Sequence, residues 1–286
     1  MNSPTPGRPF DRRGAAGEHS SVVEFSYLPV TEAQEVREFL ARLPLAVDRE
    51  HFTRFCLGFP RRYLATTSPV EIVKHYALVE SLGARAAISS LSRENDLWKM
   101  CLIARDRTFL FSSIAGTLSL FGVNVVGAEA FANRNAIILD TFTFQDLEKR
   151  IEDGAERRRF QAFVEEVAEG KRDLDAELEG RRAAAPTDPR PLAVAWDDEA
   201  HPAATLLKVR GQDRFGLLYD LSRLLSEAGC SIEIAHIETV GGAVRDDFYL
   251  ARGGRKLDSE AKAELTSRLI AMGHDERRSA SAGSTT

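Results

Sequence analysis

The first third of the chain places apolar residues three and four positions apart, a spacing typical of amphipathic helices. One such run follows Thr31, and a second extends over residues 48–57. The third run has the strongest start signal, because Ser68 can cap a helix in which Pro69 takes the first position. We therefore expect residues 23–92 to form an all-helical segment.

After Arg93 the pattern changes to apolar runs of strand length, interrupted by helical spacing. A strand, a helix, two strands and a charged helix are expected in that order, at residues 98–103, 108–121, 123–131, 136–144 and 156–179. A linker with three prolines follows at 183–191. Residues 192–196 can then form a short final strand of this unit.

The same order of elements returns in the last third of the chain. A strand, a helix, two strands and a helix are expected at 205–209, 215–228, 231–239, 244–250 and 259–272. The two copies match without a gap at an offset of 107 residues, which pairs Asp106 with Asp213, Arg107 with Arg214, Leu110 with Leu217, Gly122 with Gly229, Val125 with Ile232 and Asp140 with Asp247. Because turn residues and core residues match together, the sequence predicts a duplicated domain.

Composition and charge narrow the range of partners. The formal net charge of −5 argues against nucleic acids and anionic membrane surfaces. The uncharged run from Phe109 to Ala128 has the length of a membrane-spanning helix, but its counterpart in the second copy carries several charges, so we expect no span. Residues 1–22 and 274–286 contain few large apolar side chains and are expected to be disordered tails. With no secretory signal in the sequence, a cytoplasmic location is expected.

Motifs for catalysis or metal binding are sparse. The single Asp-x-Asp, at Asp173 and Asp175, lies in a charged helical run without the glycine turn that precedes the magnesium ligands of a nucleotidyltransferase. The histidines are scattered, and we interpret His75 as a partly buried helical residue and His236 as a strand residue. No phosphate loop, nucleophile elbow or Cys/His ligand set is present. We therefore expect no catalytic residue, no metal and no cofactor.

The turn between the first strand and the first helix of each copy is the best candidate site. Backbone N–H groups at a helix N-terminus can bind a carboxylate, and a glycine there lets a ligand approach closely. Helix capping by Asp106 or Asp213 is expected as well, and is compatible with ligand binding. The candidate ligand-binding residues are Asp106 and Arg107 in the first turn and Gln212, Asp213, Arg214, Phe215, Gly216 and Leu217 in the second.

These turns resemble the Asp-Arg-Pro-Gly-Leu signature of ACT domains. From Phe59 to about Met272, the chain is also similar to the C-terminal regulatory part of bacterial PII-protein uridylyltransferase/uridylyl-removing enzymes. The stretches that match are Phe59–Pro69, Leu139–Asp146 and Asp247–Leu250. The resemblance implies an α+β fold with two ferredoxin-like βαββαβ (ACT) domains in tandem, at 93–197 and 198–273, behind the short all-helical segment. It also implies a sensor of an amino acid, glutamine being one candidate, without the family's catalytic domains.

The two copies depart from the ACT signature in different ways. The close-approach glycine is kept as Gly216 in the second copy, whereas Phe109 replaces it in the first. The polar residue that opens the second strand, a common ligand contact in ACT domains, is Asn124 in the first copy and Ser231 in the second. ACT sites form where two domains lie side by side. The resemblance therefore leads to the hypothesis of one composite site, made by the Gln212–Gly216 loop and Asn124.

The leading hypothesis is an amino-acid-sensing regulatory protein of nitrogen or amino-acid metabolism, which forms a homodimer or docks on a metabolic or signalling protein. Small residues at Ser112, Gly116 and Ser119 fit close packing against another helix, such as that of a symmetry mate, or an ordinary exposed face. Two alternative functions stay open. One is a divergent uridylyltransferase that acts on PII, and the other is a protein-interaction module without a ligand.

Overall fold

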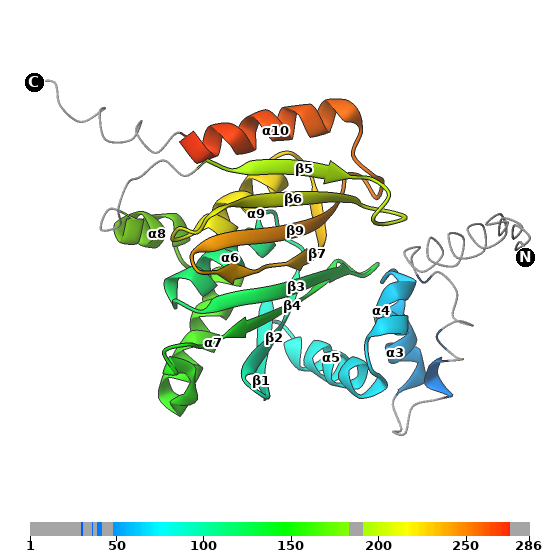
Figure 1. The fold of residues 1–286 in the computed structure, drawn as a ribbon. Helices are drawn as coiled ribbons and strands as arrows, with labels where there is room; N and C mark the ends of the chain where they lie inside the picture. Colours follow the sequence, from blue (N-terminus) through cyan, green and yellow to red (C-terminus); the bar gives the residue numbers. More distant parts are fainter. Residues whose placement is uncertain (1–29, 31–35, 37–38, 42–47, 183–190, 275–286) are drawn as a thin grey trace, which may run out of the picture.

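The computed structural model describes residues 48–182 and 191–274, together with Val30, Val36 and residues 39–41. Both expected tails therefore lie outside the described residues, apart from His274, and so does most of the helix expected after Thr31. Within the described part, a group of short helices is followed by one large sheet with further helices packed on it (Figure 1).

Three short helices form the described N-terminal part: α3 (Arg49–Cys56), α4 (Arg61–Thr66) and α5 (Pro69–Leu82). The start of α5 is as the sequence predicts, since the Ser68 hydroxyl accepts a hydrogen bond from the Glu71 N–H at 3.2 Å. The three helices share a cluster of rings whose centroids lie 4.6–6.3 Å apart, made by Phe52, Phe55, Phe59, Tyr63 and Tyr76. Such edge and tilted ring contacts stabilise the fold beyond the burial of apolar surface alone.

Within the described residues, nine strands form one antiparallel sheet in the order β1-β2-β4-β3-β7-β9-β6-β5, with the two-residue β8 (Thr239–Val240) beside β9. The first unit contains β2 (Leu97–Arg105), α6 (Leu110–Leu120), β3 (Asn124–Ala132), β4 (Ile137–Gln145), the short η1 (Arg150–Glu152) and α7 (Gly154–Ala168). The second contains β6 (Thr205–Gln212), α9 (Leu217–Glu227), β7 (Ser231–His236), β9 (Ala243–Ala251) and α10 (Ser259–His274). The repeat of strand, helix, strand, strand and helix confirms the predicted α+β duplication.

The outer strand of each unit comes from a different part of the chain than expected. In a βαββαβ order it follows the second helix, but here β1 (Ala87–Glu94) precedes β2 and pairs with it. Likewise β5 (Ala193–Asp197) precedes β6 and pairs with it. The strand expected at 192–196 therefore exists, but the prediction that it completes the first unit is wrong. The last residues of the segment expected to be all-helical, 87–92, belong to the strand β1 instead. A hairpin turn at Asn95, with φ 57°, folds β1 back onto β2.

The strand pairings of the two units correspond with a one-residue shift that the sequence match does not contain. Phe142 of β4 pairs with Ala128, and Phe248 of β9 pairs with Ala235, so β9 follows β4 at an offset of 106 rather than 107. The hairpin of the second unit is one residue shorter, which absorbs the difference. The predicted match of Asp140 with Asp247 is therefore wrong, and the structural counterpart of Asp140 is Asp246.

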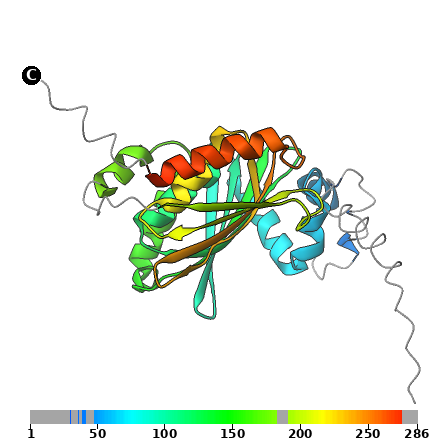
Figure 2. The ribbon, with the colours of Figure 1, turned by 45° about the horizontal axis from the view of Figure 1, so that its top comes forward.

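The two faces of the sheet have different covers. Helices α6, α7, α9 and α10 share the larger apolar core with alternate residues of the strands. The opposite face of the first unit packs on α3, α4 and α5 through Ile88, Cys101, Ile103, Phe131, Ile137 and Leu139. The N-terminal helices therefore dock on the first unit. Helix α8 (Leu174–Arg182) lies at the end of the molecule away from α3, α4 and α5 in both views (Figure 1, Figure 2).

The small residues of α6 mark a helix contact within the chain. A Cβ atom on Gly116 would lie 2.8 Å from Tyr219 Cδ2 of α9, and about as close to Leu174 and Leu178 of α8 at 3.0 Å and 3.1 Å. The close packing that the small residues predict is thus made with α8 and α9 of the same molecule.

Among the described residues, none of the helices combines the length and the apolar composition that crossing a bilayer requires.

Candidate functional site

The first-unit turn is tied to α7 by Arg107. Its Nη1 donates hydrogen bonds to the carbonyl oxygens of Val167 and Ala168, at 2.8 Å and 3.1 Å. These carbonyls belong to the C-terminal end of α7, where a positive charge is favourable. Phe109 precedes α6 with φ 64°, a left-handed conformation that glycine adopts without strain. Arg107 therefore has a structural partner that the sequence did not reveal.

Asp106 and Asp213 do not cap their helices, contrary to the prediction. Helices α6 and α9 each begin four residues beyond the aspartate, and neither has a side-chain hydrogen bond at its cap. A left-handed residue intervenes in both turns, so the carboxylate lies too early in the chain to reach the first-turn N–H groups. The backbone N–H of each aspartate donates instead to the adjacent hairpin, to Ala136 O in the first unit and Gly242 O in the second.

The second-unit turn is covered by an arginine from α8. Gly216 has φ 74°, and a Cβ atom there would lie 3.1 Å from Arg182 Nη2. Arg182 pairs with Asp220 in the first turn of α9, and Arg214 pairs with the other oxygen of the same carboxylate. The remaining predicted residues are dispersed: Gln212 ends β6 opposite Ala243, Phe215 is half-buried and Leu217 is in the core.

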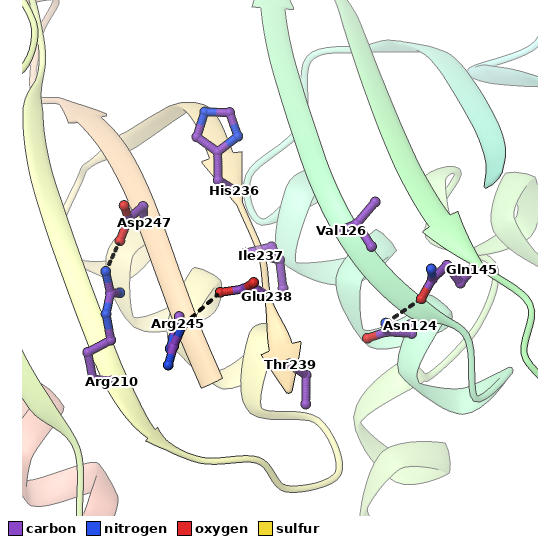
Figure 3. Close-up of a pocket in the computed structure, with 10 residues that line it drawn as sticks. All are labelled: Asn124, Val126, Gln145, Arg210, His236, Ile237, Glu238, Thr239, Arg245 and Asp247. Carbon is purple, nitrogen blue, oxygen red and sulfur yellow. Dashed lines mark hydrogen bonds and ion pairs between the residues drawn. The ribbon is translucent and has the colours of Figure 1, made fainter. Parts of the chain in front are cut away.

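Asn124 lies at a different place, in a hollow on the seam between the units. There β3 pairs with β7, and the hollow has a volume of about 570 Å³. Figure 3 shows its lining, which consists of Asn124, Val126, Gln145, Arg210, His236, Ile237, Glu238, Thr239, Arg245 and Asp247. Asn124 Nδ2 donates to Gln145 Oε1 at 3.0 Å. The first unit therefore presents a pair of side-chain amides to the hollow.

The second unit presents two ion pairs to the same hollow. Arg210 Nη2 donates to Asp247 Oδ1 at 2.6 Å, and Arg245 Nη1 lies 3.7 Å from Glu238 Oε2 (Figure 3). The longer pair is more than half exposed on both sides, so it can rearrange toward a ligand. The sequence analysis did not single out Arg210, Glu238 or Arg245. Their positions in or next to the expected strands of the second copy were a signal that could have indicated them.

The predicted composite site is not assembled as expected. Among the described residues, the lining of the seam hollow includes Asn124 but none of Gln212–Leu217, and the loop glycine faces Arg182 instead. Ser231, the counterpart of Asn124, is exposed at the start of β7. The involvement of these residues in ligand binding stays a prediction, and the geometry associates Asn124 with the β7–β9 hairpin.

Each unit buries one aspartate on its last strand. Asp140 and Asp246 are at most 2% exposed, and among the described residues neither Oδ1 has a hydrogen-bond partner. Burial, together with the nearby Asp106, raises the pKa of the Asp140 carboxyl group to about 7, and burial, together with the nearby Asp213, raises that of Asp246 to about 7. Each unit thus has a buried aspartate near the aspartate of its first turn, Asp140 near Asp106 and Asp246 near Asp213. The sequence match aligned Asp106 with Asp213 but did not align Asp140 with Asp246.

The other candidate groups have structural roles. His75 is buried, its Nδ1 lies 3.0 Å from the Tyr63 hydroxyl, and burial lowers its pKa to about 4, as expected for a buried helical residue. Asp175 accepts hydrogen bonds from Tyr219 and Arg223, which joins α8 to α9. Over the residues that the structure describes, no group of three or more His, Cys, Asp or Glu side chains could hold a metal ion.

Comparisons with known proteins agree with the motifs. No family model matches the chain. The bifunctional uridylyltransferase/uridylyl-removing enzyme of Phenylobacterium zucineum is 33% identical over 248 residues, which is 83% of this chain and 26% of that enzyme. The enzyme of the same name from Azospirillum brasilense is 32% identical over 78% of this chain and 25% of its own length.

A likeness among solved structures is much weaker. A double-ringed trimeric shell protein of the RMM microcompartment aligns with 65% of this chain at 13% identity, with a TM-score of 0.20. The chain spans about a quarter of the length of the curated relatives that it matches. Over most of its own length, this chain is therefore a homologue of a quarter-length region of the bifunctional uridylyltransferase/uridylyl-removing enzymes.

Proposed function

We propose that the chain is a regulatory module that binds a free amino acid in the seam hollow. The observation that supports it is the composition of the hollow, which joins the Asn124–Gln145 amide pair of the first unit to the Arg245–Glu238 ion pair of the second. A zwitterion needs one anionic and one cationic partner, and Glu238 and Arg245 supply them. A ligand held there contacts both units, so its binding changes how firmly the units are held together.

The amide pair gives the site its side-chain preference. Asn124 and Gln145 each carry one carbonyl oxygen and two N–H donors, and their mutual bond uses only one of these donors and one oxygen. A ligand amide can bond to the groups that remain. The proposed ligand is therefore an amino acid with an amide side chain, for which glutamine is the first candidate.

The first test is a thermal-shift screen of the twenty amino acids. A ligand that binds only the folded state, at about 100 times its Kd, stabilises that state by about 2.7 kcal/mol. For a chain of this size, the melting temperature should rise by on the order of 5 °C. Glutamine should give the largest rise. No rise with any of the twenty would contradict amino-acid sensing and would favour a module that only binds proteins.

The activity of the longer relatives provides a second test. Their name states both uridylyl transfer and uridylyl removal, whereas this chain matches about a quarter of their length. We propose that this quarter senses and does not catalyse, in a setting of nitrogen metabolism. Incubation of the chain with UTP and a PII protein should give no modified PII by mass spectrometry. A modified product would instead establish a divergent transferase.

A further inference from the structure

The sheet of the described residues ends in two edge strands, β1 and β5. An edge strand presents backbone N–H and C=O groups that have no neighbouring strand, and these groups can pair with another chain. The edge of β1 is closed by side chains of α7. Glu165 Oε1 accepts hydrogen bonds from the N–H and the hydroxyl group of Ser89 at 2.7 Å and 2.9 Å, and Gln161 Nε2 lies 3.5 Å from the Ser89 carbonyl oxygen. These side chains take the place of a further strand.

The edge of β5 has no such cover among the described residues. On β1, Ser89 lies opposite Leu102 of β2. At the repeat offset of 107, Leu102 corresponds to Val209 of β6, which lies opposite Val194. Val194 therefore directs its N–H and C=O groups outward as Ser89 does, and so does Trp196 two residues later. Within the described part of the chain, no hydrogen-bond partner of these outward groups is found.

The strand β5 is held firmly on the sides that it does not expose. At its start, Leu192 packs on Gly211, where an added Cβ atom would lie 2.7 Å from Leu192 Cδ2. The side chain of Trp196 donates from Nε1 to Thr266 Oγ1 of α10 at 2.8 Å, and Figure 1 shows α10 running along this strand. Beyond its end, Asp198 accepts a hydrogen bond from Lys262 Nζ at 2.5 Å. A rigid edge loses little conformational entropy when it pairs with another strand.

The residues of β5 are complementary to a second copy of the same strand. In an antiparallel pairing centred on Ala195, Val194 of one copy lies opposite Trp196 of the other, and each such pair exchanges both backbone hydrogen bonds. Both side chains lie on the helix-covered face, partly buried against the core. A β-branched side chain therefore meets an aromatic ring across the interface, which is a favourable pair. Asp197 lies opposite Ala193, so no like charges face each other.

We propose that β5 is a dimerisation edge, at which two copies of this chain pair antiparallel about a two-fold axis through Ala195. The partner that fits is a second copy, because the residues of the strand complement one another in this register, as an interface between identical subunits requires. The sheet then runs without a break through both molecules. The seam hollow lies between β3 and β7, so the proposal does not depend on amino-acid binding there.

A cysteine cross-link tests the register of the pairing. Ala195 is exposed, and in the proposed dimer its two Cα atoms lie about 4.5 Å apart, within the range that a disulfide spans. Ala195→Cys should therefore give a disulfide-linked dimer under mild oxidation, seen by non-reducing electrophoresis. Ala193→Cys is the matched control, because this residue is also exposed but its two copies lie about 13 Å apart along the pair, too far to link. The native cysteines, Cys56, Cys101 and Cys230, are buried.

Sedimentation equilibrium over a range of concentrations measures the strength of the pairing. The unmodified chain should form a dimer that dissociates on dilution. Val194→Pro removes an outward N–H group and no bond to β6, so the variant should keep its fold while the Kd of the dimer rises about tenfold or more. Ala195→Lys places two like charges opposite each other and should weaken the dimer as well. It serves as the second variant should the proline variant unfold.

The outcomes that overturn the proposal are distinct. A chain that stays monomeric at every concentration would exclude self-pairing and would leave the edge to an extended segment of a different protein. A dimer that is as tight in Val194→Pro and Ala195→Lys as in the unmodified chain would place the interface elsewhere. Equal cross-linking of Ala195→Cys and Ala193→Cys, or none of Ala195→Cys, would exclude a pairing centred on Ala195.

Discussion

Asp140 and Asp246 are the residues at which folding and pH are coupled most directly. Both carboxyl groups are buried, and burial raises the pKa of each to about 7, well above the value of about 3.9 expected in the unfolded chain. The folded state therefore holds each proton more tightly than the unfolded state does. Proton binding by these two groups therefore adds to the free energy of unfolding. This contribution is complete below about pH 4 and is lost as the pH rises from about 4 to about 7.

Asp140→Asn removes this titration and should reverse the trend. The free energy of unfolding of the variant, relative to the unmodified chain, should improve by up to about 1.4 kcal/mol for each pH unit between about pH 4 and pH 7. Urea unfolding at several pH values measures how this difference in the free energy of unfolding changes with pH. A stability change that the amide causes equally at every pH does not alter that slope. The fully exposed Asp96→Asn is the matched control and should show no such slope. A relative loss of stability as the pH rises would contradict the account.

At the scale of elements, the contact of α6 with α8 and α9 depends on Gly116. A Cβ atom there would lie within 3.1 Å of Tyr219, Leu174 and Leu178, closer than side chains pack. Gly116→Val should destabilise the chain by about 1–3 kcal/mol, since the helices must move apart. Gly180→Ala on α8 meets no atom within 4 Å and should stabilise by about 0.5–1 kcal/mol through helix propensity. Chemical unfolding measures both, and equal effects of the two variants would exclude the close contact.

Local signals in the sequence predicted those elements whose limits depend on their own residues. The cap at Ser68 and the spacing of apolar residues placed α5, and the matching turns placed α6 and α9. The strand β1 was missed because Ser89, Ser90 and Ser92 give its sequence a turn-like composition, while its stability comes from pairing with β2. The partner of β5 was predicted wrongly because pairing depends on the tertiary fold and not on the strand itself.

At the scale of the whole molecule, the two units form one continuous sheet through the β3–β7 pairing. The sequence led to the hypothesis of a site that combines both copies, and of the residues in that hypothesis only Asn124 lines the seam hollow. It did not indicate the rest of the hollow, because Gln145, Glu238 and Arg245 come from three other segments that only the seam brings together. Arg182 was missed for a similar reason, since it reaches the Gly216 turn from a helix outside the repeat.

The most direct test of a ligand site shared by both units is isothermal titration of glutamine into three proteins. The unmodified chain should bind one molecule. Asn124→Ala should weaken binding by about tenfold or more, because one hydrogen bond to a polar ligand is lost in the seam hollow. Asn135→Ala removes the same type of side chain from the exposed β3–β4 hairpin and should bind like the unmodified chain. Equal affinity in all three proteins would contradict the shared site.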